Sequence, residues 1–204
     1  SKMVACLEQN SDVRLAVSRR GFIDSDGCLL PREVLPPTPF DHQTEEYAIY
    51  DGREVGRVTL MSSSNFLGEP SAVLFRRNDL QHHYWRADCR GYLVISDVVM
   101  WLELLEKGDL AVFRDPLSYY RQHKAQEGQQ PDVVVLSRVE WFRIIQEYHA
   151  RGIFLDDAEY LTALEQLYKD REAAIIKMQS VVKPAMWQRY EACFRQIRAI
   201  LGQS

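Results

Sequence analysis

Asp97 combines a reactive side chain with a position that is predicted to hold it still. The segment from Gly91 to Ile95 is mostly apolar, and Ser96 or Asp97 can then cap a helix, because a short oxygen side chain accepts hydrogen bonds from the free amides of a first turn. The amino end of a helix carries partial positive charge, which keeps a carboxylate ionised. A general base must be fixed and ionised, so Asp97 is a candidate base. A simple helix cap is the alternative.

The sequence Asp24-Ser25-Asp26 has a spacing that can chelate a divalent metal ion. Two carboxylates on one turn offer the oxygen ligands that hard cations such as Mn²⁺ and Mg²⁺ favour. Gly27 follows directly, and Asp-Gly after a short strand is a strong turn signal, because glycine tolerates positive φ. We favour the turn and assign no metal ligand in this sequence.

Other side chains have types that suit binding to a sugar or a phosphate. Arg76 and Arg77 follow a predicted buried strand at its carboxyl end, where ligands tend to bind in α/β sheets, with a solvated pair as the alternative. Glu69 has a restricted backbone between a glycine and a proline, and it either binds the hydroxyl groups of a ligand or anchors its own loop. The aromatic face of Trp85 suits stacking on a sugar ring, with packing at the rim of a loop as the alternative.

Arg121 and His123 are two residues apart, so on a strand their side chains face the same side. One imidazole cannot make a metal site by itself, so His123 is not assigned as a metal ligand. A histidine packed in the core is the alternative, because the sequence shows no partner for the ring.

Composition excludes several classes of protein. The chain has 204 residues, of which 46% are hydrophobic, which is enough for a sizeable core. A net charge of -4 without a long basic run argues against a nucleic-acid partner. The four cysteines are scattered, with no zinc-binding spacing, which is typical of reduced thiols in a cytosolic protein. No apolar run is long enough to span a bilayer.

The hydrophobic pattern predicts an α/β part followed by a helical part. Apolar residues at helical spacing continue from Val98 to Leu105, with Gly108 as the stop. Strands are predicted at 13–18, 71–75, 110–113 and 117–121, the last two separated by a break at Asp115-Pro116. From Ser137 onward the pattern predicts three helices. We therefore expect an α/β unit at 1–135 and a helical extension at 136–204.

Three segments, in chain order, carry a resemblance to a known family. They are Asn65-Phe-Leu-Gly-Glu-Pro-Ser-Ala-Val-Leu-Phe-Arg-Arg77, Asp97-Val-Val-Met-Trp-Leu-Glu-Leu-Leu-Glu-Lys-Gly-Asp109 and Asp115-Pro-Leu-Ser-Tyr-Tyr-Arg-Gln-His-Lys-Ala-Gln126. Together they resemble motifs of bacterial inverting glycosyltransferases of the family 2 type, which have the GT-A fold. The resemblance covers roughly residues 2 to 126.

The resemblance implies roles for individual residues. Asp97 corresponds to the catalytic base, although Ser96 occupies a position where the family often has Glu. Glu69 would line the acceptor site, and His123 would lie near the diphosphate of the donor. Arg76, Trp85 and Arg121 complete the predicted set of substrate-binding residues.

The resemblance also implies a fold, a cofactor and partners. Residues 1–135 would be the acceptor-side half of a GT-A domain, a partial mixed sheet with flanking helices. The nucleotide-binding half would then lie upstream, outside this sequence. A divalent metal, Mn²⁺ or Mg²⁺, is expected for the complete enzyme and not for this part alone. The substrates would be a sugar nucleotide and a glycan, lipid-linked or protein acceptor.

Two functions follow from these expectations. In the first, the chain belongs to a cytoplasmic glycosyltransferase of surface polysaccharide or glycoconjugate synthesis, with peripheral association at the inner face of the membrane compatible with a lipid-linked acceptor. In the second, it is a non-catalytic module for acceptor docking or assembly within a larger synthase. On either view, we expect this part alone to be inactive.

Overall fold

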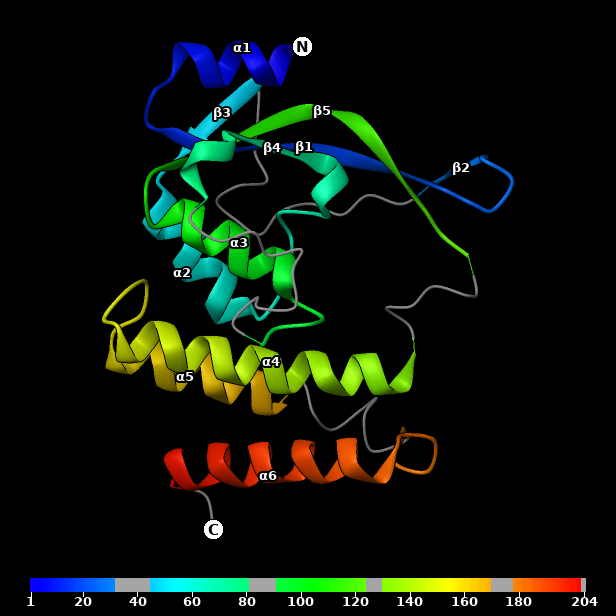
Figure 1. Cartoon of the computed structure of the whole chain (residues 1–204), viewed down its shortest axis with the longest axis vertical. Helices are drawn as coiled ribbons and strands as arrows, with labels where there is room; N and C mark the ends of the chain where they lie inside the picture. The colour runs from blue at the N-terminus through cyan, green and yellow to red at the C-terminus, as the bar shows by residue number, and fades with distance from the viewer. Residues whose placement is uncertain (32–44, 81–90, 124–129, 170–177, 203–204) are drawn as a thin grey trace. The chain divides into compact units, whose positions relative to one another are not determined.

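The chain is a mixed α/β protein, as predicted (Figure 1). A computed structural model describes residues 1–31, 45–80, 91–123, 130–169 and 178–202. The chain forms two compact units. The first contains residues 1–58, 65–91 and 96–124, and the second contains residues 59–64, 92–95 and 125–204. The predicted boundary after residue 135 falls inside a helix that begins at Pro131.

The first unit contains a five-stranded mixed sheet. Its central strands, β1 (Val13–Ile23) and β5 (Asp109–Arg121), run parallel. The remaining strands pair antiparallel, β2 (Leu29–Leu30) and β4 (Val73–Phe75) with β1, and β3 (Tyr47–Tyr50) with β5. Short 3-10 helices at Pro70–Ala72 and Arg77–Asp79 flank β4, which is shorter than the predicted strand.

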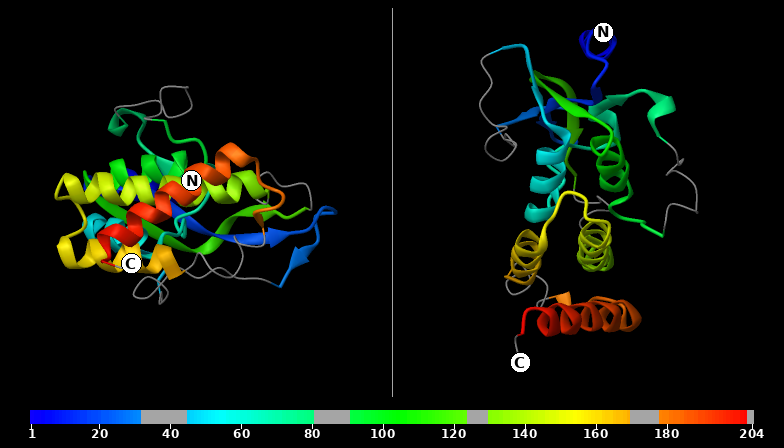
Figure 2. Two further views of the ribbon diagram at one scale, coloured as in Figure 1. Left: turned by 90° about the horizontal axis from the view of Figure 1, so that it is seen from below. Right: turned by 90° about the vertical axis from the view of Figure 1, so that its left-hand side faces the viewer.

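Both faces of the central strands are covered, which explains their apolar sequence. Residues 15–18 of β1 are all buried, a pattern expected where a strand has helices on both sides. Helix α1 (Lys2–Gln9) lies on one face, and α2 (Gly52–Ser62) and α3 (Ser96–Leu105) lie on the other (Figures 1 and 2). Under α1, a cluster of buried side chains is formed by Cys6, Leu7, Val13, Ala16, Ala111 and Phe113.

Strand β5 continues through Pro116, so the predicted break into two strands is wrong. The pairing moves from Ser18 opposite Phe113 to Arg19 opposite Pro116, which leaves two extra residues on β5. Such a bulge interrupts the ladder of hydrogen bonds and tolerates a proline, which has no amide hydrogen to donate. The proline therefore marks an irregularity within one strand.

Helix α3 turns directly into β5 at Gly108. The amide of Asp109 donates to the carbonyl oxygen of Asp12 at 2.8 Å, so β5 starts beside the start of β1. A Cβ at Gly108 would lie 2.1 Å from that carbonyl oxygen, so only glycine fits. Because α3 runs opposite to β5, the amino end of α3 points toward the carboxyl ends of the parallel strands (Figure 1).

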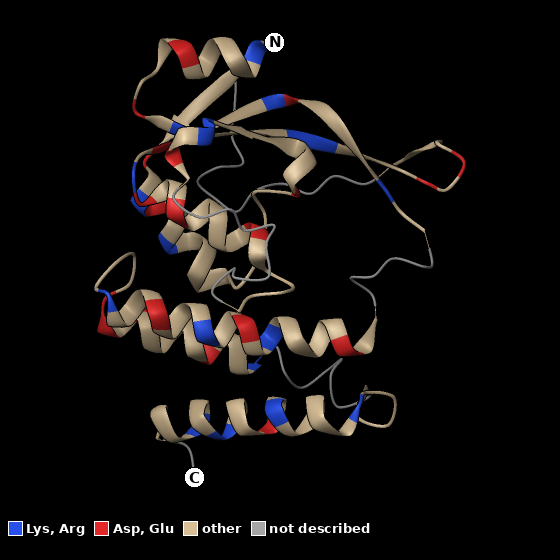
Figure 3. Ribbon diagram, in the orientation of Figure 1, with Lys and Arg blue, Asp and Glu red and all other residues tan. Residues whose placement is uncertain are grey.

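The second unit is mainly helical, as predicted for the end of the chain. Helix α4 (Pro131–Ala150) packs against α5 (Asp157–Lys169) and α6 (Pro184–Ile200). Acidic and basic residues alternate along α4 (Figure 3). Proline in the first turn suits α4 and α6. A reciprocal pair caps α5, in which Asp156 accepts from the amide of Glu159 and Glu159 accepts from the amide of Asp156.

A buried carboxylate on α4 fixes a loop of this unit. Glu140 is 3% exposed and accepts hydrogen bonds from the successive amides of Leu93, Val94 and Ile95, at 2.8 to 3.0 Å. Tyr92 donates to Glu147 at 3.2 Å, also on α4. These bonds satisfy the backbone of residues 93–95 and compensate the cost of burying the charge of Glu140.

Among the helices that the structure describes, none is both long and apolar enough to cross a membrane.

Replacing Gly108 with alanine is expected to reduce the free energy of unfolding by about 3 kcal/mol or more, because the new methyl group meets a backbone oxygen that cannot rotate away. Urea denaturation followed by circular dichroism measures the effect. Gly27→Ala is the control in the same unit. Gly27 has φ of +90° but no close neighbour, so we expect a loss of only about 1 kcal/mol. Equal losses would contradict the steric explanation.

Candidate functional site

Asp97 lies in the first turn of α3, where both oxygens of its side chain are engaged. Oδ1 accepts from the amide of Val98 at 2.8 Å, and Oδ2 accepts from Nδ2 of Asn65 at 2.8 Å. The residue is half-buried. Each oxygen retains room for one more hydrogen bond, since a carboxylate oxygen has two acceptor positions. The carboxylate is therefore held in one orientation and can still receive a proton.

The loop from Asn65 to Glu69 is fastened to α3 by two side chains. Oδ1 of Asn65 accepts from the amide of Gly68 at 3.1 Å, while its Nδ2 also donates to the carbonyl oxygen of Gly68 at 3.3 Å. Trp101, on α3, donates to the same carbonyl oxygen at 3.1 Å. Gly68 is buried with φ of +112°, a conformation that favours glycine. The loop is thus closed on itself and tied to the helix.

Glu69 connects this loop to the sheet. Its Oε2 accepts from Nη1 of Arg20 at 2.6 Å, and the side chains are 35% and 13% exposed, respectively. Arg20 belongs to β1, beyond the bulge, toward the carboxyl ends of the parallel strands. Asp97 and Glu69, both predicted as site residues, therefore belong to one network at the edge of the sheet where α/β proteins bind ligands.

Burial dominates the electrostatics of Asp97. The pKa of the carboxyl is raised from 3.8 to about 6, with burial as the largest cause; the negative charge of Glu69 also raises it, and hydrogen bonds from Val98 and Asn65 lower it. The sequence predicted that the positive helix end would keep this carboxylate ionised; in the structure, loss of water outweighs that effect. A base with a pKa near 6 is still mostly ionised at pH 7 and is closer to the range that suits proton transfer.

A small cavity adjoins the loop and the sheet. Its volume is about 30 Å³, and Arg20, Phe66 and Leu67 are among the residues that line it. This is room for a water molecule rather than for a sugar ring. A larger ligand of this network would have to approach from the solvent side of Glu69, whose side chain is partly exposed.

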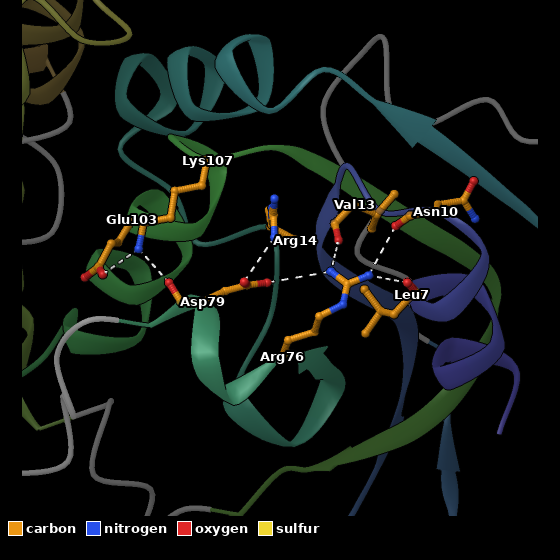
Figure 4. A network of polar contacts seen from close by, with 8 residues as sticks. All are labelled: Leu7, Asn10, Val13, Arg14, Arg76, Asp79, Glu103 and Lys107. Carbon is orange, nitrogen blue, oxygen red and sulfur yellow. Dashed lines mark hydrogen bonds and ion pairs between the residues drawn. The ribbon is translucent and has the colours of Figure 1, made fainter.

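Arg76, predicted to bind substrate, directs its guanidinium to the backbone (Figure 4). It donates to the carbonyl oxygens of Val13 at 2.7 Å, Asn10 at 3.2 Å and Leu7, and it lies 3.6 Å from a carboxylate oxygen of Asp79. Carbonyl groups near the carboxyl end of α1 lack partners within the helix, so Arg76 satisfies them and joins α1 to β1. These contacts are with this junction and not with Asp97.

Three other residues, Arg121, His123 and Trp85, were also predicted to bind substrate. Arg121 donates from Nη1 to the carbonyl oxygens of Asp24 and Ser25, both at 2.9 Å. His123 follows the end of β5 and is exposed. Trp85 lies outside the described residues.

Asp24-Ser25-Asp26 forms a turn, as we favoured. Oδ1 of Asp24 accepts from the amides of Asp26 and Cys28, both at 2.9 Å, and Gly27 has positive φ. This carboxylate is therefore already used by the backbone of its own loop. In the described part of the chain, no three His, Cys, Asp or Glu side chains gather as a metal site. The turn at Asp24 therefore does not fit a divalent metal ion, which the resemblance implies only for the complete enzyme.

The network includes residues that the sequence did not indicate as functional. Asn65 followed three residues later by glycine is a turn signal, but it says nothing of Asp97, which is far along the chain. Arg20 has no signal, because its ion pair with Glu69 depends on how β1 and the loop meet. Trp101 was recognised as a core residue of the helix, and its indole donor to Gly68 was missed.

Comparison with known proteins does not identify the chain. No family model matches the sequence, and no curated protein matches it either. The interpretation of the site therefore depends on the geometry described above and on the resemblance of the three motifs.

Replacing Arg76 with alanine is expected to lower the free energy of unfolding by about 2 to 3 kcal/mol, because buried carbonyl groups lose a charged donor. The neighbouring Arg77 is exposed, so Arg77→Ala should change it by less than about 0.5 kcal/mol. Urea denaturation of both variants measures the difference. Equal stabilities would show that the Arg76 contacts contribute nothing to the fold.

Asp97 should make the protein less stable as pH rises. Between about pH 4 and pH 6 the folded chain binds a proton at Asp97 that the unfolded chain releases, because the folded pKa is the higher one. The advantage of Asp97→Asn over the wild type should therefore grow by about 2 to 3 kcal/mol from pH 4 to pH 7. Urea denaturation at several pH values measures it. A difference for Asp97→Asn that stays flat over this pH range would contradict the raised pKa.

Proposed function

We propose that this chain carries the acceptor side of an inverting, sugar-nucleotide-dependent glycosyltransferase, with Asp97 as the general base. One observation supports this most strongly: the carboxylate of Asp97 is held at the amino end of a buried helix, with both oxygens engaged, in the same network as Glu69. Keeping a carboxylate in this environment costs stability, a feature typical of functional sites. The resemblance of the three motifs supplies the reaction.

The proposed reaction is a single displacement. An acceptor hydroxyl donates its hydrogen bond to Asp97, and the carboxylate takes the proton as the oxygen attacks the anomeric carbon of the donor sugar. The new carbon–oxygen bond forms on the face opposite the leaving group. The bond to the nucleoside diphosphate breaks, which inverts the configuration. Asp97 then returns the proton to solvent, and its pKa near 6 favours that release at neutral pH.

Glu69 is proposed to orient the acceptor. Its side chain is partly exposed, so its carboxylate can accept a hydrogen bond from a second hydroxyl of the acceptor. The ion pair with Arg20 keeps Glu69 in place and balances its charge beside Asp97. A polyhydroxylated acceptor fits such a pair of carboxylates, whereas an anionic group would be repelled by them.

A non-catalytic role in acceptor docking is the second candidate. It is favoured by the use of Arg76 and Arg121, two predicted substrate residues, as donors to backbone carbonyl groups. On that view, the Asp97 network would bind a glycan without transferring a sugar to it. The first proposal, a glycosyltransferase, also includes what its resemblance to the family implies. These expectations are a cytoplasmic location, peripheral association with a membrane and a role in surface polysaccharide synthesis.

Transfer is tested in a longer polypeptide that contains this chain together with a nucleotide-binding half, because this part alone is expected to be inactive. The polypeptide is incubated with UDP-, GDP- and dTDP-sugars, Mn²⁺ and a panel of oligosaccharides, and glycosylated products are detected by mass spectrometry. We expect product with the wild type and a loss of about 100-fold or more in Asp97→Asn, because the base is removed. Asp26→Asn should retain the wild-type rate, since Asp26 lies in an exposed turn.

Two results would decide against the catalytic proposal. Transfer by Asp97→Asn at the wild-type rate would exclude Asp97 as the base. Absence of product from the wild type, together with oligosaccharide-dependent NMR shifts at Asp97 and Glu69, would favour the docking role.

A further inference from the structure

We infer that Asn65 is the positioning residue of this site, which holds the carboxylate of Asp97 and the turn that carries Glu69 in one fixed arrangement. The inference deepens the proposed function and rests on it for its catalytic consequence. The arrangement itself is a property of the described side chains and can be tested without any activity.

Both the NH₂ group and the oxygen of the Asn65 side chain form hydrogen bonds. Nδ2 donates to Oδ2 of Asp97 at 2.8 Å and to the carbonyl oxygen of Gly68 at 3.3 Å, while Oδ1 accepts from the amide of Gly68 at 3.1 Å. An aspartate in this place would offer no donor to Asp97, and a lysine would offer no acceptor to Gly68. The site thus uses a group that is donor and acceptor at once.

The bond to Asp97 is not needed to close the loop. The loop is already closed by the two bonds between Asn65 and Gly68, and Trp101 secures the same carbonyl oxygen. The bond from Asn65 to Asp97 instead crosses to α3, a helix far along the chain. Its effect is to fix Oδ2 of Asp97 while the amide of Val98 fixes Oδ1.

The hydrogen bond from Asn65 also affects the charge of Asp97. The charged neighbour that affects Asp97 is Glu69, which carries the same sign and is paired with Arg20. No ion pair joins Asp97 to a cation among the described residues, so hydrogen bonds favour its ionised form: those from the amides of Val98 and Asp97 and that from the side chain of Asn65. Loss of the Asn65 donor should therefore make the carboxylate harder to ionise.

The test is a titration of Asp97 by ¹³C NMR of its carboxyl group, whose resonance is identified by its loss in Asp97→Asn. We expect the titration midpoint of Asn65→Ala to lie above that of the wild type, because a donor to the ionised form is gone. Asn65→Asp should raise the midpoint further, since it also adds a negative charge. The amide signal of Gly68 reports whether the loop has kept its structure.

Two further variants separate positioning from loop support. Asn65→Ser keeps a short acceptor for the Gly68 amide but has no donor that reaches Asp97. It should therefore raise the titration midpoint of Asp97. This variant replaces Asn65→Ala in the test if the alanine variant does not fold. Trp101→Phe removes the other donor to Gly68 and leaves the bond from Asn65 to Asp97, so its midpoint should match the wild type.

The outcomes distinguish this inference from the proposed function. A midpoint for Asn65→Ser equal to that of the wild type, or an equal rise in Trp101→Phe, would overturn it. If the wild type transfers sugar, Asn65→Ser should lower kcat by roughly tenfold and move the rising limb of the pH profile upward, with a smaller change in KM. If the titration midpoints of Asp97 are as expected but the wild type transfers no sugar, the proposed function is refuted. The placement of Asp97 by Asn65 would still stand.

Discussion

The contact between Gly108 and the carbonyl oxygen of Asp12 is the constraint on which the first unit depends. It lets the backbone turn from α3 into β5 within van der Waals distance of the start of β1, so the two central strands begin together and run parallel. The direction of α3 is then fixed, because a helix that ends at this turn must begin at the other end of the strands. The place of Asp97 near the carboxyl ends of β1 and β5 is a consequence of this one close approach.

The same packing explains the raised pKa of Asp97. From Val98 to Leu105 every residue of α3 is buried, so the first turn is drawn toward the core with the rest of the helix. Burial disfavours the charged form more than the helix end and two hydrogen bonds favour it. The result is a carboxylate that is fixed and costly to ionise. Fixed geometry and a pKa near neutrality arise here from one cause, the depth at which α3 packs.

Local sequence rules predicted the elements that local forces determine, and they were less informative where distant segments meet. The apolar pattern of α3 and the turn at Asp24 were predictable because each depends on residues within one or two turns of the chain. The proline in β5 was misread, because pairing with β1 on both sides of a bulge outweighs its local preference. The partners of Asn65 and Arg20 could not be predicted, since both contacts join segments that only the fold brings together.

The arginines show why residue type alone is a poor guide to function in this chain. Arg76, Arg121 and Arg20 were equally able to bind an anion on chemical grounds. Arg76 instead stabilises the junction of α1 with β1, and Arg121 stabilises a hairpin turn, because each lies beside carbonyl groups that would otherwise lack donors. Arg20 pairs with a side chain that is partly open to solvent. On the proposed function, a ligand would therefore reach the Asp97 network from the side of Glu69, whose ion pair with Arg20 it would meet first.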